Sequence, residues 1–220
     1  YCLAPLADFI YRKPGTLSFA EAALTDPLAG ALHATRRANL QTCEFVAILG
    51  AGTLGLMTLQ VAKAQATEVL ISDVSDAKLD LARRLGADHL VNAREQNVVE
   101  AVRELTGGLG ADASFEAVGS SQTIRDAVAA VRKGGRAVII GLSANASDPV
   151  DMNDVTMSEK TIMGTFGFRR EYADALRLLT TGVVKAEPLI SYRFPLAELS
   201  RAFETILEKR DEVYKVVIEG

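Results

Sequence analysis

The stretch "LGAGTLG" at residues 49–55 follows the apolar run 45–49 and precedes a segment with helical periodicity. Its glycines fit the pattern G-x-G-x-x-G, which in a strand–turn–helix setting is typical of dinucleotide-binding turns. Gly50 would permit a tight turn, Gly52 would let the backbone approach a pyrophosphate, and Gly55 would let helix and strand pack closely. The helix start would face the phosphates, where the helix dipole favours negative charge. A tight turn without a ligand is the alternative.

An acidic residue stands at the distance that such a turn requires. Asp73 ends the apolar run "VLISD" and follows Gly50 by 23 positions, close to the spacing of about 20 expected for a ribose-binding acid. A carboxylate accepts hydrogen bonds from both ribose hydroxyls but repels a 2′-phosphate, so the pattern predicts NAD rather than NADP. Lys78 is interpreted as a second ribose contact, with a solvated lysine in the first helical turn as an equal alternative.

Around this turn, short β-rich runs alternate with helical segments. In the helix expected after Asp73, Ala77, Leu81 and Leu85 recur every four residues and define one apolar face. The strand runs show little alternation, which is typical of parallel strands buried on both faces. This order predicts an α/β fold with an open, doubly wound parallel sheet. The expected strands are 45–49, 69–72, 89–91, 113–115 and 136–140, and the expected helices are about 53–66, 76–86, 95–106 and 121–132.

Other glycines are expected to end helices rather than to bind a ligand. Gly86, Gly107 and Gly134 stand where a left-handed residue closes a helix. The glycine-rich stretches "TGGLGAD" (106–112) and "KGGRAV" (133–138) are both predicted to be a helix stop followed by a loop.

The two ends of the chain do not continue the alternation of strands and helices seen in the central part. Residues 1–27 suggest one or two strands and then a helix whose capping box is Ser18 with Glu21. We predict three parts: a remnant of a second domain (1–27), a cofactor-binding domain (28–166) and a return to the second domain (167–220). The last part is expected to contain a helix near 170–181, a strand near 189–194, a helix at 196–208 and a strand at 213–218.

Composition narrows the class of protein. The chain has 220 residues, of which 49% are hydrophobic and 24% charged, so it can bury a large core. Its net charge of −4 argues against nucleic acid or an anionic membrane as a partner. Two cysteines, Cys2 and Cys43, predict a reducing cytoplasm rather than a disulfide framework. We expect neither a signal peptide nor a membrane span, because no apolar run approaches about 18 residues.

The two histidines do not suggest a metal site. His33 falls on an expected helix and His89 opens an expected strand, 56 positions later. Two isolated histidines fall short of a ligand set, so structural roles are favoured for both.

Several segments together resemble the zinc-dependent medium-chain alcohol and polyol dehydrogenases, closest to the sorbitol and threonine dehydrogenase branch. They are "SFAEAALTDPLAGALHATRRANL", "VAILGAGTLGLMTLQVAKA", "LARRLGADHLVN", "GADASFEAVGSS", "GGRAVIIGL" and "LAELSRAFETILEKRDEVYKVVIEG". In that family a GroES-like β-rich domain precedes this region and carries the Cys and His-Glu ligands of the catalytic zinc. The start at Tyr1, without Met, therefore agrees with a longer chain. The resemblance also implies pairing of cofactor domains edge to edge, for which the expected strand near 161–166 is the candidate.

The resemblance implies roles for further residues. Asp26, in "TDPLAG", takes the position of an acid or cysteine at or beside the zinc; an N-cap before Pro27 is the alternative. Glu116 and the pair Arg169 and Arg170 are interpreted as structural or surface residues. The remaining cofactor contacts implied by the family are Thr53 and Leu54 at the pyrophosphate and nicotinamide, Ala117, Val118 and Gly119 beside the adenosine, Ile140, Gly141, Leu142, Thr165 and Phe166 around the nicotinamide, and Lys215 near the pyrophosphate.

The resemblance implies an NAD-dependent, zinc-containing dehydrogenase that moves hydride between a secondary alcohol and NAD. Zinc would act as a Lewis acid that favours the alkoxide. This chain alone would bind NAD and remain inactive, because the main zinc ligands are missing from it. The expected partners are a small alcohol or polyol and further copies of the chain. The alternatives are a zinc-free, NADPH-dependent reductase of the quinone type and a non-catalytic NAD-binding module.

Overall fold

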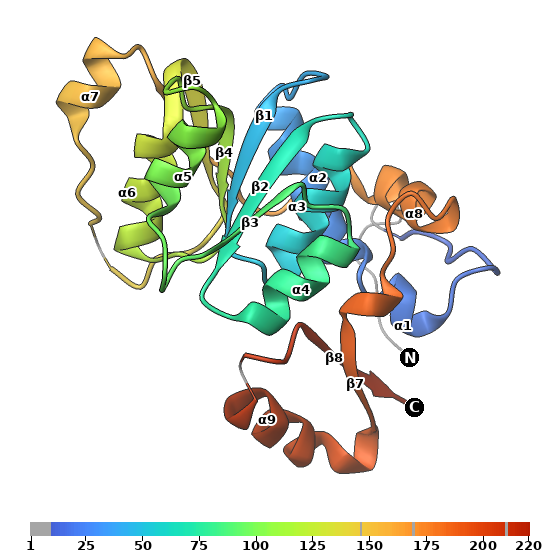
Figure 1. Cartoon of the computed structure of the whole chain (residues 1–220). Coiled ribbons are helices and arrows are strands. Elements are labelled where there is room, and N and C mark those ends of the chain that lie inside the picture. The colour runs from blue at the N-terminus through green and yellow to red at the C-terminus, as the bar shows by residue number, and fades with distance from the viewer. Residues whose placement is uncertain (1–9, 146, 169, 210) are drawn as a thin grey trace.

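The computed structural model describes residues 10–145, 147–168, 170–209 and 211–220 (Figure 1). Its centre is a six-stranded parallel sheet in the order β3-β2-β1-β4-β5-β6. The first strand, β1, lies in the interior of the sheet. The next two strands extend the sheet to one edge, and the last three extend it from the other side of β1. The doubly wound α/β fold expected from the sequence is therefore confirmed. The strands are β1 (Phe45–Leu49), β2 (Glu68–Asp73), β3 (His89–Asn92), β4 (Ala111–Glu116), β5 (Val131–Ile139) and β6 (Thr161–Gly164).

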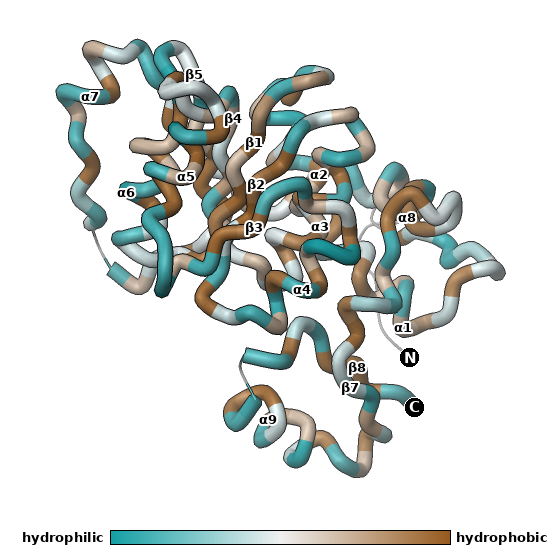
Figure 2. The backbone as a smooth tube through the Cα atoms, viewed as in Figure 1, coloured by the Kyte–Doolittle hydropathy of each residue, from teal (hydrophilic) through white to brown (hydrophobic). Residues whose placement is uncertain are grey.

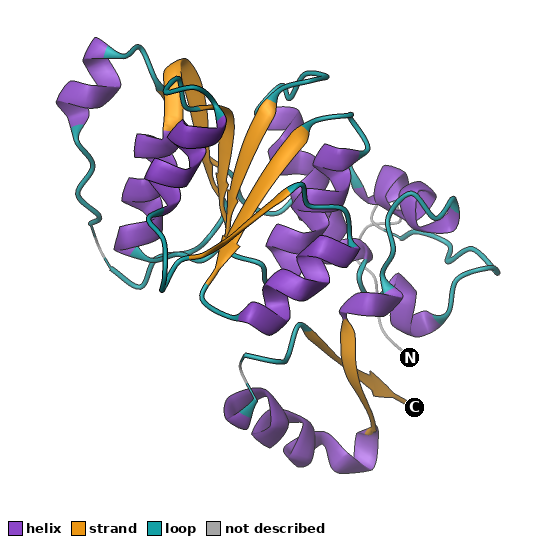
Figure 3. Cartoon of the chain, viewed as in Figure 1, coloured by secondary structure: helices purple, strands orange, loops and turns teal. Residues whose placement is uncertain are grey.

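Helices cover both faces of this sheet (Figures 1 and 3). One layer contains α2 (Thr25–Arg37), α3 (Thr53–Lys63) and α4 (Asp76–Arg84), and the other contains α5 (Val98–Leu105) and α6 (Ser121–Ala130). The sheet separates two hydrophobic clusters, one beneath each layer. All five residues of β1 are buried, and Figure 2 shows the central strands as largely hydrophobic. Burial on both faces explains why the strand sequences do not alternate.

A smaller unit lies beyond the carboxyl ends of the sheet strands (Figure 1). Its two strands, β7 and β8, form a separate parallel sheet, and α9 connects them. Helix α8 packs against α2 in the main layer. The elements outside the six-stranded sheet and its helical layers are α1 (Phe19–Ala22), α7 (Met152–Met157), α8 (Tyr172–Thr180), the short 3₁₀ turns η2 (Glu187–Leu189) and η3 (Leu196–Glu198), β7 (Ile190–Pro195), α9 (Leu199–Glu208) and β8 (Lys215–Glu219).

Most local expectations hold, and the exceptions have clear causes. The capping box of Ser18 and Glu21 is present at the start of α1. Residues 10–17 form no strand, and residues 1–9 of the expected strands lie outside the described residues. Helix α7 was not expected from the sequence. Gly86 and Gly107 do follow helices in the left-handed region.

The stretch "KGGRAV" is not a helix stop. Helix α6 ends at Ala130, and the chain passes directly into β5 at Val131. Gly134, with φ of +68°, lies inside β5, where the pairing with β4 shifts register. A Cβ on Gly135 would come within 2.8 Å of the Arg132 carbonyl oxygen, so the glycines serve an irregular strand rather than a helix end.

The predicted boundary between residues 27 and 28 falls inside α2, which packs on both α3 and α8. The three-part division stays a prediction. None of the helices in the described ranges has the length and apolar character needed to cross a bilayer.

Candidate functional site

The glycine turn after β1 is closed so tightly that side chains do not fit at two of its positions. Gly50 has φ of +105°, and a Cβ there would lie 2.7 Å from a methyl group of Val118. A Cβ on Gly55 would lie 1.8 Å from the Gly50 carbonyl oxygen. At Gly52 the same construction meets no atom within 4 Å. The turn is thus packed on its inner side and open at Gly52, where a group from outside the chain has room to approach.

Helix α3 begins at this turn without a side-chain cap, because its N-cap residue is Gly52. The next three helices along the chain are capped. Ser75 caps α4, Asn97 caps α5 and Ser120 caps α6, each by accepting hydrogen bonds from backbone N–H groups of the first turn. An uncapped helix start presents partial positive charge and N–H donors, which suit an anionic group such as a phosphate.

Asp73 is fixed beside the glycine turn. One carboxylate oxygen, Oδ2, accepts a hydrogen bond from the Ala51 amide at 2.8 Å, and Oδ1 accepts one from the Ser75 amide at 3.0 Å. Each carboxylate oxygen has a further lone pair, so Asp73 can still accept hydrogen bonds from vicinal hydroxyls. Lys78, in the first turn of α4, lines the same cleft as Asp73.

This cleft has a volume of about 600 Å³ and lies at the carboxyl ends of β1, β2 and β4. The order of strands reverses between β1 and β4, which is where open α/β sheets bind their ligands. Sequence reasoning missed several lining residues on the loops and helices that follow β2, β3 and β4. These residues could have been found from the sequence, because helices that follow neighbouring parallel strands start at the same edge of the sheet. The first turns of those helices are therefore expected to line the same cleft. The missed residues are Val74, Ala93, Gln96, Asn97, Val98, Ser120, Gln122, Thr123 and Asp126.

The side chain of Glu116 is fully buried at the end of β4. The interpretation of Glu116 as a surface residue is therefore wrong. Oε1 accepts hydrogen bonds from the amides of Val118 and Gly119, at 2.9 and 2.8 Å, and from the Thr123 hydroxyl at 2.7 Å. Oε2 is buried and has no hydrogen-bond partner among the described residues. The structural interpretation is the correct one, because Glu116 shapes the loop after β4.

The loops after β4 and β5 cross in backbone contact. A Cβ on Gly119 would lie 2.4 Å from the Leu142 carbonyl oxygen, and one on Gly141 would lie 2.2 Å from the Gly119 nitrogen. The Thr165 amide donates to the Ile139 carbonyl at 3.0 Å, which places the end of β6 beside the end of β5. Leu142 and Phe166 are largely exposed. The structure thus gathers the residues predicted around the nicotinamide at the ends of β5 and β6.

The chain entering β8 lies against the starts of α3 and α4. The Thr53 hydroxyl donates to the Tyr214 carbonyl at 2.7 Å, and the Ser75 hydroxyl donates to the Asp211 carbonyl at 3.2 Å. Lys215 follows directly and begins β8. Leu54 points elsewhere, toward α2, with its Cδ1 atom 3.7 Å from the Cβ position of Gly30.

Asp26 does not cap α2, so the N-cap alternative is wrong. The helix begins at Thr25, its N-cap residue is Leu24, and Asp26 lies exposed in the first turn. In the part of the chain that the structure describes, no group of three His, Cys, Asp or Glu residues could hold a metal ion. Asp26 therefore does not belong to a complete zinc site among these residues.

The histidines and Arg170 agree with the structural or surface roles expected for them. His33 contacts Glu171 through Nδ1 at 3.1 Å, and His89 contacts Glu68 through Nε2 at 2.8 Å. Arg170 is exposed, and Arg169 lies outside the described residues.

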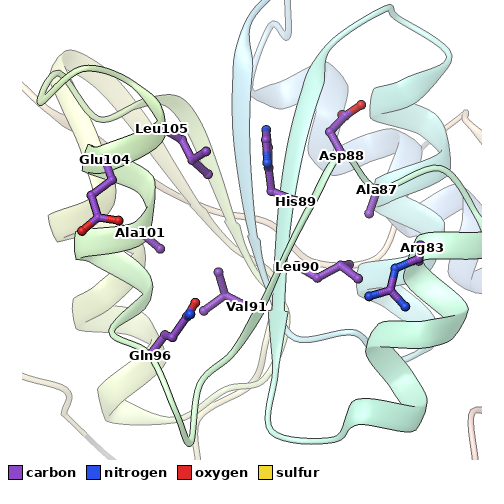
Figure 4. A pocket seen from close by; sticks show the side chains of 10 residues that line it. All are labelled: Arg83, Ala87, Asp88, His89, Leu90, Val91, Gln96, Ala101, Glu104 and Leu105. Carbon is purple, nitrogen blue, oxygen red and sulfur yellow. The ribbon is translucent and has the colours of Figure 1, made fainter.

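A second cavity, of about 530 Å³, lies at the amino end of β3 between α4 and α5 (Figure 4). Burial raises the pKa of the Asp88 carboxyl there, but hydrogen bonds from Lys63 and the Val69 amide outweigh it and leave the pKa below its ordinary value. His89 is held by Glu68. Three of the charged side chains that line this cavity, Arg83, Asp88 and His89, are already paired with other charged groups.

Comparison with known proteins agrees with this geometry. The family model described as zinc-binding dehydrogenase matches residues 53–181, from the glycine turn to the end of α8. The chain belongs to the zinc-binding dehydrogenase family. Among its relatives, sorbitol dehydrogenase from Bacillus subtilis is 32% identical over 96% of this chain and 60% of its own length. Human sorbitol dehydrogenase is 33% identical over 90% of this chain and 56% of its own length.

Solved structures of dehydrogenases share the fold. The 2R,3R-butanediol dehydrogenase from Bacillus subtilis superimposes with a TM-score of 0.88, at 27% identity, over 96% of this chain and 60% of its own. A zinc-binding dehydrogenase from Sinorhizobium meliloti, bound to NADP, has a TM-score of 0.83 at 28% identity, over 87% of this chain and 57% of its own. The chain thus spans about 60% of the length of the proteins it resembles.

Proposed function

We propose that this chain is the NAD-binding part of a zinc-dependent dehydrogenase that transfers hydride between a secondary alcohol or polyol and NAD. The observation that carries the proposal is the carboxylate of Asp73, held by the Ala51 amide beside a glycine turn that is open at Gly52. This arrangement fits a dinucleotide, because an acid and an uncapped helix start suit a ribose and a pyrophosphate. Family membership supports dehydrogenase chemistry.

In this proposal the cleft and the loops next to it divide the cofactor among them. Bound NAD would supply the hydride acceptor, and the chain would bind and orient it. The carboxylate of Asp73 would accept hydrogen bonds from both ribose hydroxyls, with Lys78 beside it. The other assignments are Gly50, Gly52 and Gly55 at the pyrophosphate, Thr53 and Leu54 at the pyrophosphate and nicotinamide, Lys215 near the pyrophosphate, Ala117, Val118 and Gly119 beside the adenosine, and Ile140, Gly141, Leu142, Thr165 and Phe166 around the nicotinamide.

The zinc is a different case, because the described residues do not fit it. Asp26 would provide one oxygen ligand at most, and a zinc site needs three or four. Ligands beyond the described residues would be required. We therefore expect this chain by itself to bind NAD without oxidising an alcohol. The substrate class is supported by relatives named sorbitol dehydrogenase and butanediol dehydrogenase.

We also propose that copies of the chain associate through β6. Among the described residues this strand pairs with β5 alone and forms one edge of the sheet, and Ile162 on it is 38% exposed. Proteins usually cover or pair an exposed strand edge. Sedimentation at micromolar concentration tests this, and a monomer would count against it. A cytoplasmic location stays a prediction that rests on the two cysteines of the sequence.

The decisive experiment compares NADH with NADPH by fluorescence titration of the purified chain. We expect NADH to bind at least about tenfold more tightly, because the Asp73 carboxylate repels a 2′-phosphate. Asp73→Ser should weaken NADH binding and abolish the preference. Asp80→Ala is the matched control, since Asp80 is exposed on α4 and pairs only with Arg83 among the described residues.

Two results would contradict the proposal. A wild-type chain that binds neither nucleotide has no dinucleotide site. A preference for NADPH would instead favour the zinc-free reductase, in which Lys78 would contact the extra phosphate.

A further inference from the structure

Two exposed valines line the cleft that contains Asp73. Val74, directly after β2, is 43% exposed, and Val118, two residues after the end of β4, is 53% exposed. Exposed valines on two strand ends that flank one cleft suit the two faces of a flat aromatic ring. In the proposed complex, the ring attached to the ribose that Asp73 holds is adenine, so this part of the cleft is where the base would lie.

Asp126, in the middle of α6, also lines this cleft, and no role in the fold explains its position. Its contact within the helix is the hydrogen bond that Gln122 Nε2 donates to Oδ1 at 2.8 Å. No donor to Oδ2 is found within the described ranges. Burial raises the pKa of the Asp126 carboxyl, while the Gln122 hydrogen bond and the positive charge of Arg125 act in the opposite direction. The carboxylate is thus partly desolvated and keeps an oxygen available.

A pair such as Gln122 and Asp126, four residues apart on a helix, contributes only about 0.2–0.5 kcal/mol to helix stability. A partly buried carboxylate loses hydration, and this loss is usually offset by a hydrogen-bond donor. Adenine offers such a donor, because its 6-amino group carries two N–H bonds. The unsubstituted nitrogens at the edge of the ring are acceptors, which a carboxylate would repel.

We propose that Asp126 accepts a hydrogen bond from the 6-amino group of the adenine of NAD and thereby selects an adenine base. This inference rests on the proposed NAD site and adds to it a residue that recognises the adenine base. Asp73 would recognise the sugar and Asp126 the base, from opposite sides of the cleft. Asp126 is a binding residue in this account and takes no part in the reaction.

The test is a calorimetric cycle with two ligands and two proteins. The ligands are NAD and the NAD analogue whose base is unsubstituted purine, which lacks only the 6-amino group. The proteins are the wild-type chain and Asp126→Ala, which places a good helix former in α6. Loss of the amino group should weaken binding to the wild-type chain by about tenfold, a usual value for a hydrogen bond to a charged group. In Asp126→Ala the two ligands should bind equally.

The Asp80→Ala variant is the control and should show the same tenfold difference as the wild-type chain, since Asp80 lies on α4 and does not line the cleft. If the wild-type chain binds both ligands equally, or if Asp126→Ala keeps the tenfold difference, Asp126 does not read the base, and the proposed function is unaffected. If the wild-type chain binds neither ligand, the proposed function itself is wrong, and this inference with it.

Discussion

Helices α3 and α6 start at the same edge of the sheet, after the neighbouring strands β1 and β4, but their first turns are built differently. In α6, Ser120 and Thr123 cap each other, and the Thr123 hydroxyl also donates to Glu116. In α3 the N-cap residue is Gly52, and no side chain caps the helix. The chain thus caps one helix start with its own side chains and leaves the other without a side-chain cap. In the proposed function, stability and ligand binding would belong to adjacent turns.

The largest expected effect comes from filling the closed side of the α3 turn. Gly55→Ala should lower the free energy of unfolding by more than about 3 kcal/mol, because its Cβ would overlap the Gly50 carbonyl oxygen and a backbone atom cannot rotate away. Urea denaturation followed by circular dichroism measures this. Gly52→Ala is the matched control, since its Cβ meets open space; it should cost less than about 1 kcal/mol and still weaken NAD binding.

Removal of the acceptor beneath the α6 turn should have the next largest effect. Glu116→Ala leaves two amides and the Thr123 hydroxyl without their shared acceptor, and we expect a loss of about 2–3 kcal/mol. Glu116→Gln keeps an oxygen in that position and should lose less than about 1 kcal/mol. Equal losses in the two variants, again by urea denaturation, would mean that packing rather than hydrogen bonding holds this loop.

Loss of the α6 cap itself should have a smaller effect. Ser120→Ala removes the hydroxyl that accepts from the Thr123 amide and should lower the free energy of unfolding by about 1 kcal/mol. Ser120→Asn, which keeps a capping side chain, should be close to the wild-type chain. An unchanged stability in Ser120→Ala would show that α6 does not depend on its cap, and the contrast with α3 would lose its meaning.

The smallest expected effect is on the capping box of α1, which includes the charged carboxylate of Glu21. Hydrogen bonds from the amide and the hydroxyl of Ser18 lower the pKa of the Glu21 carboxyl below its ordinary value of 4.5. The folded pKa is the lower one, so this stabilisation is complete above the ordinary value and is lost as the pH falls through the folded pKa. An NMR titration of Glu21 should show the lowered pKa, and Ser18→Gly should return it part of the way. A pKa at the ordinary value in the wild-type chain would contradict the capping box.

The sequence predicted the main sheet because its signals are local. The apolar run 45–49, the glycine turn and the acid at position 73 depend on near neighbours and on a known spacing, and β1 has the expected bounds. "KGGRAV" was misread because a glycine pair looks the same after a helix and inside an irregular strand. Only the pairing of β5 with β4 distinguishes the two cases.

The candidate site was predicted less completely, because its walls come from distant parts of the chain. The alternative role of Asp26 as an N-cap rests on Pro27, but α2 begins one residue before Asp26. The sequence did not indicate a binding role for Asp126, because a single acidic residue on an amphipathic helix is usually interpreted as a surface residue. The cofactor roles of the residues carried over from the family stay predictions.

By itself, the sequence determined the succession of strands and helices, the closed glycine turn and the presence of an acid at the end of β2, because each depends on residues close together in the chain. Tertiary structure alone decided that Glu116 is buried beneath the loop after β4, that Asp126 lines the same cleft as Asp73, and that the chain entering β8 lies on the glycine turn. The physical reason is that these relations arise where the ends of parallel strands meet. Residues far apart in sequence become neighbours there through the packing of the whole sheet.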